Sequence, residues 1–167
     1  NSGVNWTVAT TNPNATNVPY CLDFPTAVVA VIGTAVGGAA RTIYYSTDGG
    51  VNWTLCTSGP AGATLAISMF NATTGFAVAD GGALYKTTDG GVNWSDTTYT
   101  SVDPLSANDI KADILAVSAT ECVFLTFVLT VSRVEYFSGS ANSVVQVYVE
   151  DIGSDGIPFK PVILTNG

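Results

Sequence analysis

The sequence predicts an all-β domain assembled from repeated four-stranded units. Two observations carry this prediction: one segment occurs twice, and short runs of β-branched and aromatic residues alternate with glycine-rich turns. The 167 residues are enough for one domain with a hydrophobic core. We therefore expect residues 1–167 to form a single all-β domain.

The repeated segment defines the units. STDGGVNWT at 46–54 recurs 41 residues later as TTDGGVNWS at 87–95, and the seven central residues are identical. GVNWT at 3–7 is the tail of a third copy, 47 residues before its counterpart. Matches of this length indicate an internal repeat rather than chance.

Four strands are expected in each unit, from alternation and turn residues. In the first unit they lie at about 20–24, 27–32, 41–46 and 51–56. In the second they lie at about 64–70, 75–79, 83–87 and 92–98, with the hairpin turn Asp80-Gly81-Gly82 between the second and third strands. The last third suggests strands at 112–118, 122–131, 134–138 and 144–151.

Folding alone explains each residue type in the repeated segment. The Asp accepts backbone N–H groups a residue or two on, the Gly pair adopts conformations that other residues resist, the Trp is buried, and the Ser or Thr hydroxyl bonds back to the loop. A calcium site is the alternative, but one Asp per turn supplies too few oxygen ligands. No metal and no cofactor are therefore expected. The structural residues are Ser46, Asp48, Gly50, Trp53, Thr87, Asp89, Gly91, Trp94 and Trp6.

The pattern Ser-x-Asp-Gly-Gly-x-Asn-Trp resembles the Asp-box, or BNR repeat, of sialidases, sortilin-type receptors and photosystem assembly factors. The stretch 66–94 is similar to the assembly-factor type, with GFAV at 75–78 and KTTDGG at 86–91. The resemblance covers roughly residues 1–100. It implies that each box closes the hairpin between the third and fourth strands of a β-propeller blade, away from the binding face.

The expected organisation is about three blades that this chain alone does not close into a ring. Residues 1–9 are the tail of one unit, 18–57 and 62–100 are blades, and 110–165 are a divergent blade or another β module. A β-sandwich is the alternative. Open sheet edges would require other copies of the chain or further blades of a longer protein.

Composition excludes several function classes. Five Lys and Arg against 13 Asp and Glu give a net charge of −8, which argues against binding nucleic acids or anionic membranes. No apolar run reaches the roughly 20 residues of a membrane-spanning helix. The chain has no His, the commonest general base near neutral pH.

Low charge and abundant hydroxyl residues favour an exported protein at the cell surface, virion surface or outside the cell. Asn-x-Ser/Thr acceptor sites for glycosylation begin at Asn5, Asn14, Asn52, Asn71 and Asn93. Three cysteines allow one disulfide, with Cys21 and Cys56 as the candidate pair, although sequence cannot choose the pair and buried thiols explain them equally well.

A sialidase-like glycosidase is the least favoured function. That family requires an arginine cluster, whereas this chain has only Arg41 and Arg133. The paired-carboxylate candidate is Glu135 with Asp151, and no feature distinguishes it. We therefore expect no enzymatic activity and no catalytic residues.

The sequence favours an exported structural or adhesive subunit of a filament, sheath or similar assembly. The alternative is a receptor or assembly-factor module that binds a glycan or a protein. Aromatic residues that could line such a site, although strand aromatics more often pack in the core, are Tyr20, Tyr44, Tyr45, Phe76, Tyr85 and Tyr99.

Overall fold

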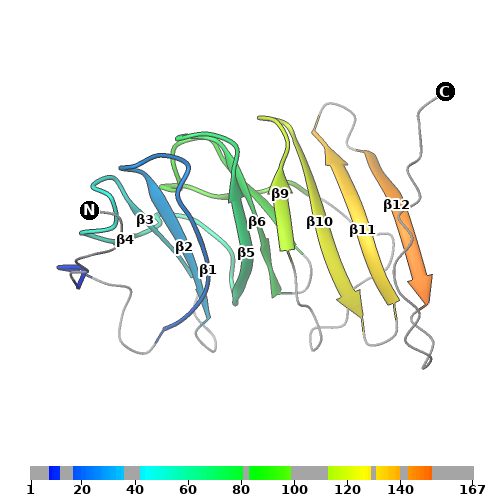
Figure 1. Cartoon of the computed structure of the whole chain (residues 1–167), viewed down its shortest axis with the longest axis horizontal. Coiled ribbons are helices and arrows are strands. Elements are labelled where there is room, and N and C mark those ends of the chain that lie inside the picture. The colour runs from blue at the N-terminus through cyan, green and yellow to red at the C-terminus, as the bar shows by residue number, and fades with distance from the viewer. Residues whose placement is uncertain are drawn as a thin grey trace.

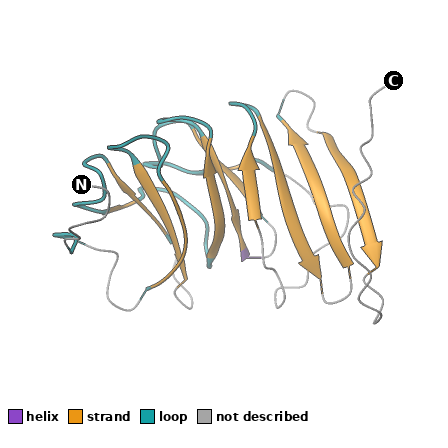
Figure 2. Ribbon diagram, in the orientation of Figure 1, coloured by secondary structure: helices purple, strands orange, loops and turns teal. Residues whose placement is uncertain are grey.

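The computed structural model describes residues 8–11, 17–35, 42–80, 83–98, 113–128, 131–139 and 143–151. These residues form almost only strands and loops (Figure 2). The partial third repeat with Trp6 and Asn5, the acceptor Asn14, Arg41 and Tyr99 lie outside the described residues.

Three four-stranded antiparallel sheets follow one another along the chain. The first contains β1 (Val18–Asp23), β2 (Ala30–Ala35), β3 (Ile43–Ser46) and β4 (Thr54–Leu55). The second contains β5 (Thr64–Met69), β6 (Gly75–Ala79), β7 (Leu84–Thr87) and β8 (Ser95–Asp96). The third contains β9 (Asp113–Ala116), β10 (Glu121–Val128), β11 (Val131–Ser138) and β12 (Ser143–Asp151).

The sheets stack in series, with the second between the first and the third (Figure 1). Within each sheet every strand pairs with its neighbour in sequence. The described strands after residue 112 therefore form a sheet of the same kind as the two repeats. The described strands do not form a two-sheet sandwich or a closed ring, so the expected open series of about three propeller-type blades is confirmed.

Four expected strand boundaries are wrong for local reasons. β2 begins at Ala30 rather than at 27, because the Thr26 hydroxyl accepts the N–H groups of Val28 and Val29 at 3.3 and 2.9 Å and holds a turn there. β4 is shortened to 54–55 and β8 to 95–96, because the repeat turns extend to residues 53 and 94. The break expected at 132–133 lies earlier, since β10 ends at Val128 and pairs there with Val131.

The hydrophobic core is divided into two layers, each shared by neighbouring sheets. The layer between the first and second sheets contains Val31, Ile43, Cys56, Ile67, Met69, Ala77 and Trp94. The layer between the second and third contains Ala66, Phe76, Val78, Leu84, Ile114, Cys122, Phe124 and Phe137. Because strand side chains alternate between faces, the second sheet contributes one face to each layer.

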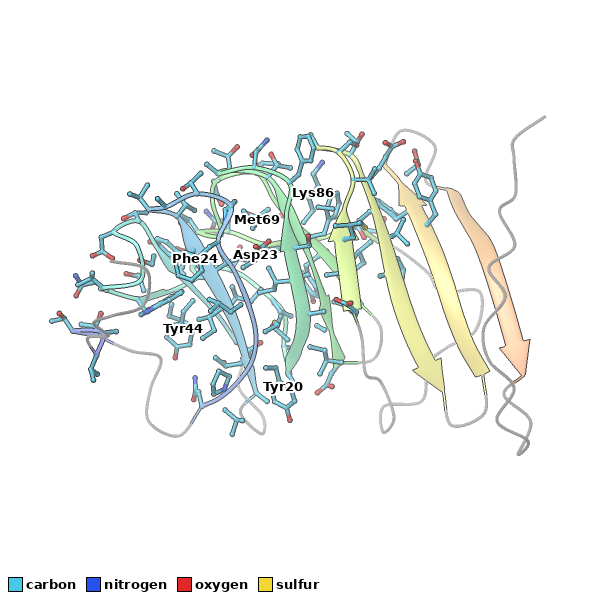
Figure 3. All side chains as sticks on the ribbon, in the orientation of Figure 1. Tyr20, Asp23, Phe24, Tyr44, Met69 and Lys86 are labelled. Carbon is cyan, nitrogen blue, oxygen red and sulfur yellow. The ribbon has the colours of Figure 1, made fainter. Side chains whose placement is uncertain are left out.

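Hydrogen bonds at matching positions join neighbouring sheets. The Asp23 carboxylate accepts the Met69 N–H at 2.6 Å, between the first and second sheets (Figure 3). The Ser68 hydroxyl accepts the Ala116 N–H at 3.1 Å, between the second and third. Asp23 and Ser68 occupy the same register position, opposite Val31 and Phe76 respectively, so the repeat extends to the contacts between sheets.

Substitution of Phe76 by alanine tests the layer between the second and third sheets. Phe76 is fully buried and meets Phe137 edge to face, with ring centroids 6.1 Å apart. Its loss leaves a cavity that costs about 3–5 kcal/mol. Urea unfolding of Phe76→Ala measures the cost. Phe70→Ala, which truncates an exposed Phe, is the matched control with an expected change of about 0.5 kcal/mol or less. Equal destabilisation by both variants would contradict this account of the core.

Candidate functional site

The first repeat turn (residues 46–53) is organised by the carboxylate of Asp48. Its Oδ1 accepts the Ser46 hydroxyl at 2.8 Å and the Asn52 backbone N–H at 2.9 Å. Its Oδ2 accepts the Asn52 side-chain amide at 2.7 Å. The Ser46 hydroxyl in turn accepts the Gly50 N–H at 2.9 Å. Five polar contacts of the turn are thereby satisfied locally, including the Asp48 N–H that approaches Ser46 Oγ at 3.3 Å.

The second repeat turn (residues 87–94) has the same bonds. Asp89 accepts the Thr87 hydroxyl at 3.0 Å, the Asn93 N–H at 2.9 Å and the Asn93 amide at 2.8 Å. The Thr87 hydroxyl accepts the Gly91 N–H at 3.0 Å. In both turns the carboxylate therefore accepts bonds from the Asn four residues later in the sequence, and not from residues one or two positions later as we expected. Recurrence of the Asn in both copies was the available sequence signal for this partner.

Both turns require glycine at two consecutive positions. The φ angles are +75° and +86° at Gly49 and Gly50, and +76° and +92° at Gly90 and Gly91. L-residues other than glycine rarely adopt these angles. The glycines thus allow the chain to turn back toward the Asp.

The two tryptophans differ in burial although their turns match. Trp94 is only 2% exposed, lies in the layer between the first and second sheets, and donates its indole N–H to the Gly91 carbonyl at 3.0 Å. Trp53 is only half-buried. The first sheet covers Trp94, whereas no described sheet precedes the first and covers Trp53. Burial of both tryptophans was expected, and the expectation is wrong for Trp53.

All three described glycosylation acceptors have a role in a turn. Asn52 and Asn93 bond to the repeat-turn carboxylates as above. Asn71 accepts the Thr73 N–H, the Thr73 hydroxyl and the Thr74 N–H at 2.9, 3.0 and 2.8 Å in the connection between β5 and β6. Folding therefore accounts for these residues, and their glycosylation stays a prediction.

The candidate disulfide is not formed. Cys21 is a half-buried free thiol whose S–H donates to the Thr64 carbonyl at 3.8 Å, so the expected bond to Cys56 is absent. Burial raises the pKa of Cys21 to about 12, and does the same for the thiol of Cys122. A thiol held protonated at neutral pH is a poor nucleophile, which matches the alternative of small buried apolar residues.

An apolar surface, here called the first-sheet face, lies on the side of the first sheet away from the second. Leu22 pairs with Ile32, and Ile32 pairs with Tyr44, so the three side chains form a cross-strand row. Phe24 extends this surface, and Figure 3 shows Phe24 and Tyr44 on the side of β2 away from β5. The first-sheet face therefore consists of Leu22, Phe24, Ile32 and Tyr44.

A bulge in β1 presents Tyr20 beside this face. The register shifts between Pro19 and Cys21, which leaves Tyr20 as the extra residue, and its side chain is 58% exposed. Bulges bend the strand and re-aim a side chain in this way. A shallow hollow of about 330 Å³, here called the Tyr20 hollow, is lined by Pro19, Tyr20, Cys21, Leu22 and Ile32.

The structure separates the five aromatic candidates that it describes, all but Tyr99. Phe76 is part of the core, and Tyr45 and Tyr85 pack against the layer between the first and second sheets. Tyr20 and Tyr44 lie on the accessible surface of the first sheet, where Tyr44 accepts the Asn17 amide at 2.9 Å. Strand aromatics that alternate with other apolar residues do not indicate which sheet face will be covered, so sequence could not make this division.

Within the described residues, no group of three or more His, Cys, Asp and Glu side chains is placed to hold a metal ion. The same part of the chain contains no helix that is long and apolar enough to span a membrane.

Solved structures with the same fold are β-propellers. YCF48 bound to a D1 peptide superposes with a TM-score of 0.65 at 21% sequence identity, over 84% of this chain and 43% of that chain. YCF48 from Cyanidioschyzon merolae gives 0.64 at 14% identity, over 85% and 40%. The GH74 enzyme of Niastella koreensis gives 0.52 at 20% identity, over 77% and 17%. At these identities the likeness establishes the fold only.

The chain spans less than half the length of each of these structures. A scan against protein-family models and a search of curated proteins give no match. The fold is therefore that of part of a β-propeller, with three blades in the described residues.

Comparing Gly91→Ala with Gly50→Ala separates the cost of backbone strain in the turn from the cost of a clash with the neighbouring sheet. Both positions have positive φ, so either substitution costs about 1–2 kcal/mol. A Cβ at Gly91 would lie 2.7 Å from Val31 Cγ1 in the first sheet, whereas the nearest atoms at Gly50 are 3.4 Å away. We expect Gly91→Ala to destabilise by about 1–3 kcal/mol more than Gly50→Ala in urea unfolding. Equal effects would mean that the two sheets do not meet at Gly91.

The Asp48 turn predicts a pH dependence. Bonds from the Asn52 N–H, the Asn52 amide and the Ser46 hydroxyl lower the pKa of Asp48 from 3.8 to about 2. Because the folded state has the lower pKa, this contribution is present above about pH 4 and is lost as the pH falls toward 2. The difference in unfolding free energy between the wild type and Asp48→Asn is therefore expected to shrink between pH 5 and pH 2. A difference that stays constant with pH would contradict the turn's dependence on the carboxylate.

Proposed function

We propose that this chain is a protein-binding β-propeller module of the assembly-factor kind, and that an extended segment of its partner binds in the Tyr20 hollow. The observation that carries the proposal is the exposed Tyr20 on a β1 bulge beside an apolar sheet face. A tyrosine ring offers a large apolar surface and a hydroxyl for hydrogen bonding, which suits an anchor in a protein interface.

The shape of the surface favours an extended ligand. Among the described strands, β1 pairs only with β2, so its other edge carries backbone groups without a strand partner. An extended segment can use such groups for main-chain bonds while a side chain enters the hollow. The lining is mostly apolar, as in recognition sites for hydrophobic side chains.

The fold likeness supports a peptide ligand. YCF48, a structure with the same fold, is known with a bound D1 peptide. A propeller of this kind therefore can bind a peptide, and we extend this to the present chain as part of the proposal.

We further propose that the two repeat turns are Asp-boxes with a structural role. Their carboxylates are satisfied by groups of the same turn, which leaves the Asp48 and Asp89 oxygens occupied by local donors. Residues used in this way stabilise the hairpins and do not need a ligand.

We also propose that the chain by itself is not a glycosidase. The sialidase family requires an arginine cluster, and Arg41 and Arg133 are the only arginines of this chain.

An exported structural subunit, glycosylated at the cell or virion surface, is the second candidate function. Low charge, abundant hydroxyl residues and the acceptor sites support export. The exposed Leu22 on the first sheet and Leu115 on the third, among the described residues, favour a role in an assembly.

Selection of peptides tests the main proposal. A phage-displayed library of random peptides is selected on the immobilised chain, and the affinities of enriched peptides are measured by fluorescence anisotropy, with the D1 peptide as an additional probe. Tyr20→Ala is expected to weaken binding about tenfold or more, because it removes the anchor. Phe70→Ala, another exposed aromatic truncation, should leave affinity unchanged. Failure to enrich any peptide, or equal binding by Tyr20→Ala, would refute the proposal.

A further inference from the structure

The geometry points to a second copy of this chain as a partner of the first-sheet face. We propose that the third sheet of one copy docks on the first sheet of another, head to tail, by the same contact that joins neighbouring sheets within the chain. This goes beyond the proposed peptide binding because it identifies a different partner, on a surface that shares Leu22 and Ile32 with the Tyr20 hollow.

The internal contact shows what covers a face of this type. In the second sheet, Ile67 pairs with Ala77, and Ala77 pairs with Tyr85. This row packs against the first sheet, and Ile67 is only 8% exposed. Tyr85 and Tyr44 are 41 residues apart, the repeat spacing, so the row corresponds to Leu22, Ile32 and Tyr44 in the first sheet.

The corresponding residues of the first sheet remain exposed. Leu22 is 53% exposed where its counterpart Ile67 is 8% exposed. Phe24 is 46% exposed where its counterpart Met69 is 8% exposed. Likewise, Trp53 in the first repeat turn is more exposed than Trp94 in the second. The first-sheet face therefore has the composition of a covered sheet but lacks the covering sheet among the described residues.

The other end of the series exposes an apolar face as well. Leu115 pairs with Val123, and Val123 pairs with Tyr136, on the side of the third sheet opposite its layer with the second. Leu115 is 63% exposed, and Val117 is also exposed. A shallow hollow of about 500 Å³ lies here, lined by Asp113, Ile114, Leu115 and Val123. We call Leu115, Val117, Val123 and Tyr136 the third-sheet face.

The two faces are related as successive faces within the chain. Each sheet has one face toward the preceding sheet and one toward the following sheet. The third-sheet face is of the second kind, like the face of the first sheet that the second sheet covers. The first-sheet face is of the first kind. Different surfaces that meet head to tail give rings or filaments. Two copies would bring six sheets together, within the 4–8 blades of closed propellers.

Charge is low at both faces. The four residues of the first-sheet face are uncharged. At the third-sheet face Asp113 lines the hollow, and Glu121 accepts the hydroxyls of Tyr136 and Ser118. Each copy carries a net charge of −8, so salt that screens this repulsion should strengthen association.

One bond of the internal contacts is missing from the contact between copies. In the internal contacts, Asp23 and Ser68 accept the N–H groups of Met69 and Ala116. Leu115 occupies the register position of these two acceptors, and Phe24 occupies that of the two donors. A leucine side chain cannot accept the Phe24 N–H. Apolar burial must therefore carry the contact. Association is expected to be reversible and to depend on concentration.

Analytical ultracentrifugation of the chain tests the proposal. The wild type should form particles of at least twice the chain mass of 17.2 kDa, increasingly at higher concentration and salt. Leu22→Asp and Leu115→Asp should each shift the association midpoint at least tenfold upward, since each buries an unpaired charge in the contact. An equimolar mixture of the two variants should restore a dimer, because one intact contact remains between unlike copies.

A control variant separates the outcomes. Val28→Asp makes the same charge change at an exposed valine before β2, away from the Leu22 row, so it should associate like the wild type. A wild type that stays monomeric up to about 1 mM would overturn the proposal. So would association by Leu115→Asp alone, which would place two first-sheet faces together. Peptide binding by a monomeric wild type would leave the proposed function standing.

Discussion

Burial of apolar sheet faces against neighbouring sheets is the constraint on which the rest of this structure depends. Each four-stranded sheet is too thin to enclose its own core, so its large side chains become buried only when a second sheet covers them. Phe76 and Trp94 are buried on opposite faces of the second sheet, each by a different neighbour. Among the described residues, the middle sheet has buried side chains on both faces, whereas Leu22 on the first sheet and Leu115 on the third remain exposed.

The repeat turns connect local chemistry to this stacking. An Asp, an Asn and a hydroxyl bond to one another within each turn, and the glycines allow the backbone conformation. In the second turn this places Gly91 against Val31 and Trp94 in the layer between sheets. The turn thus stabilises its own hairpin and also sets how closely the next sheet approaches. The open faces that result are the surfaces on which both proposed kinds of binding depend.

Much of the fold could be predicted because its signals are local. Repetition of the segment at 46–54 and 87–95 indicated two units of four short strands, and the β-branched runs after residue 110 indicated four more. Strand ends were less predictable where a side chain captured the backbone, as Thr26 does before β2. The candidate site was partly predictable. Tyr20 and Tyr44 were among the aromatic candidates, but so were Phe76, which is buried in the core, and Tyr85, which packs against it.

The sequence by itself determined the strand units and the turns, since a turn of this kind depends on hydrogen bonds within eight residues and on glycine's backbone freedom. Only the tertiary structure decided which of two matching residues is buried. Trp53 and Trp94 occupy the same place in the same motif, and so do Leu22 and Ile67 in the register, yet one of each pair remains accessible. The physical reason is that burial of a sheet face depends on a neighbouring sheet distant in sequence, and no local pattern records whether that neighbour is present.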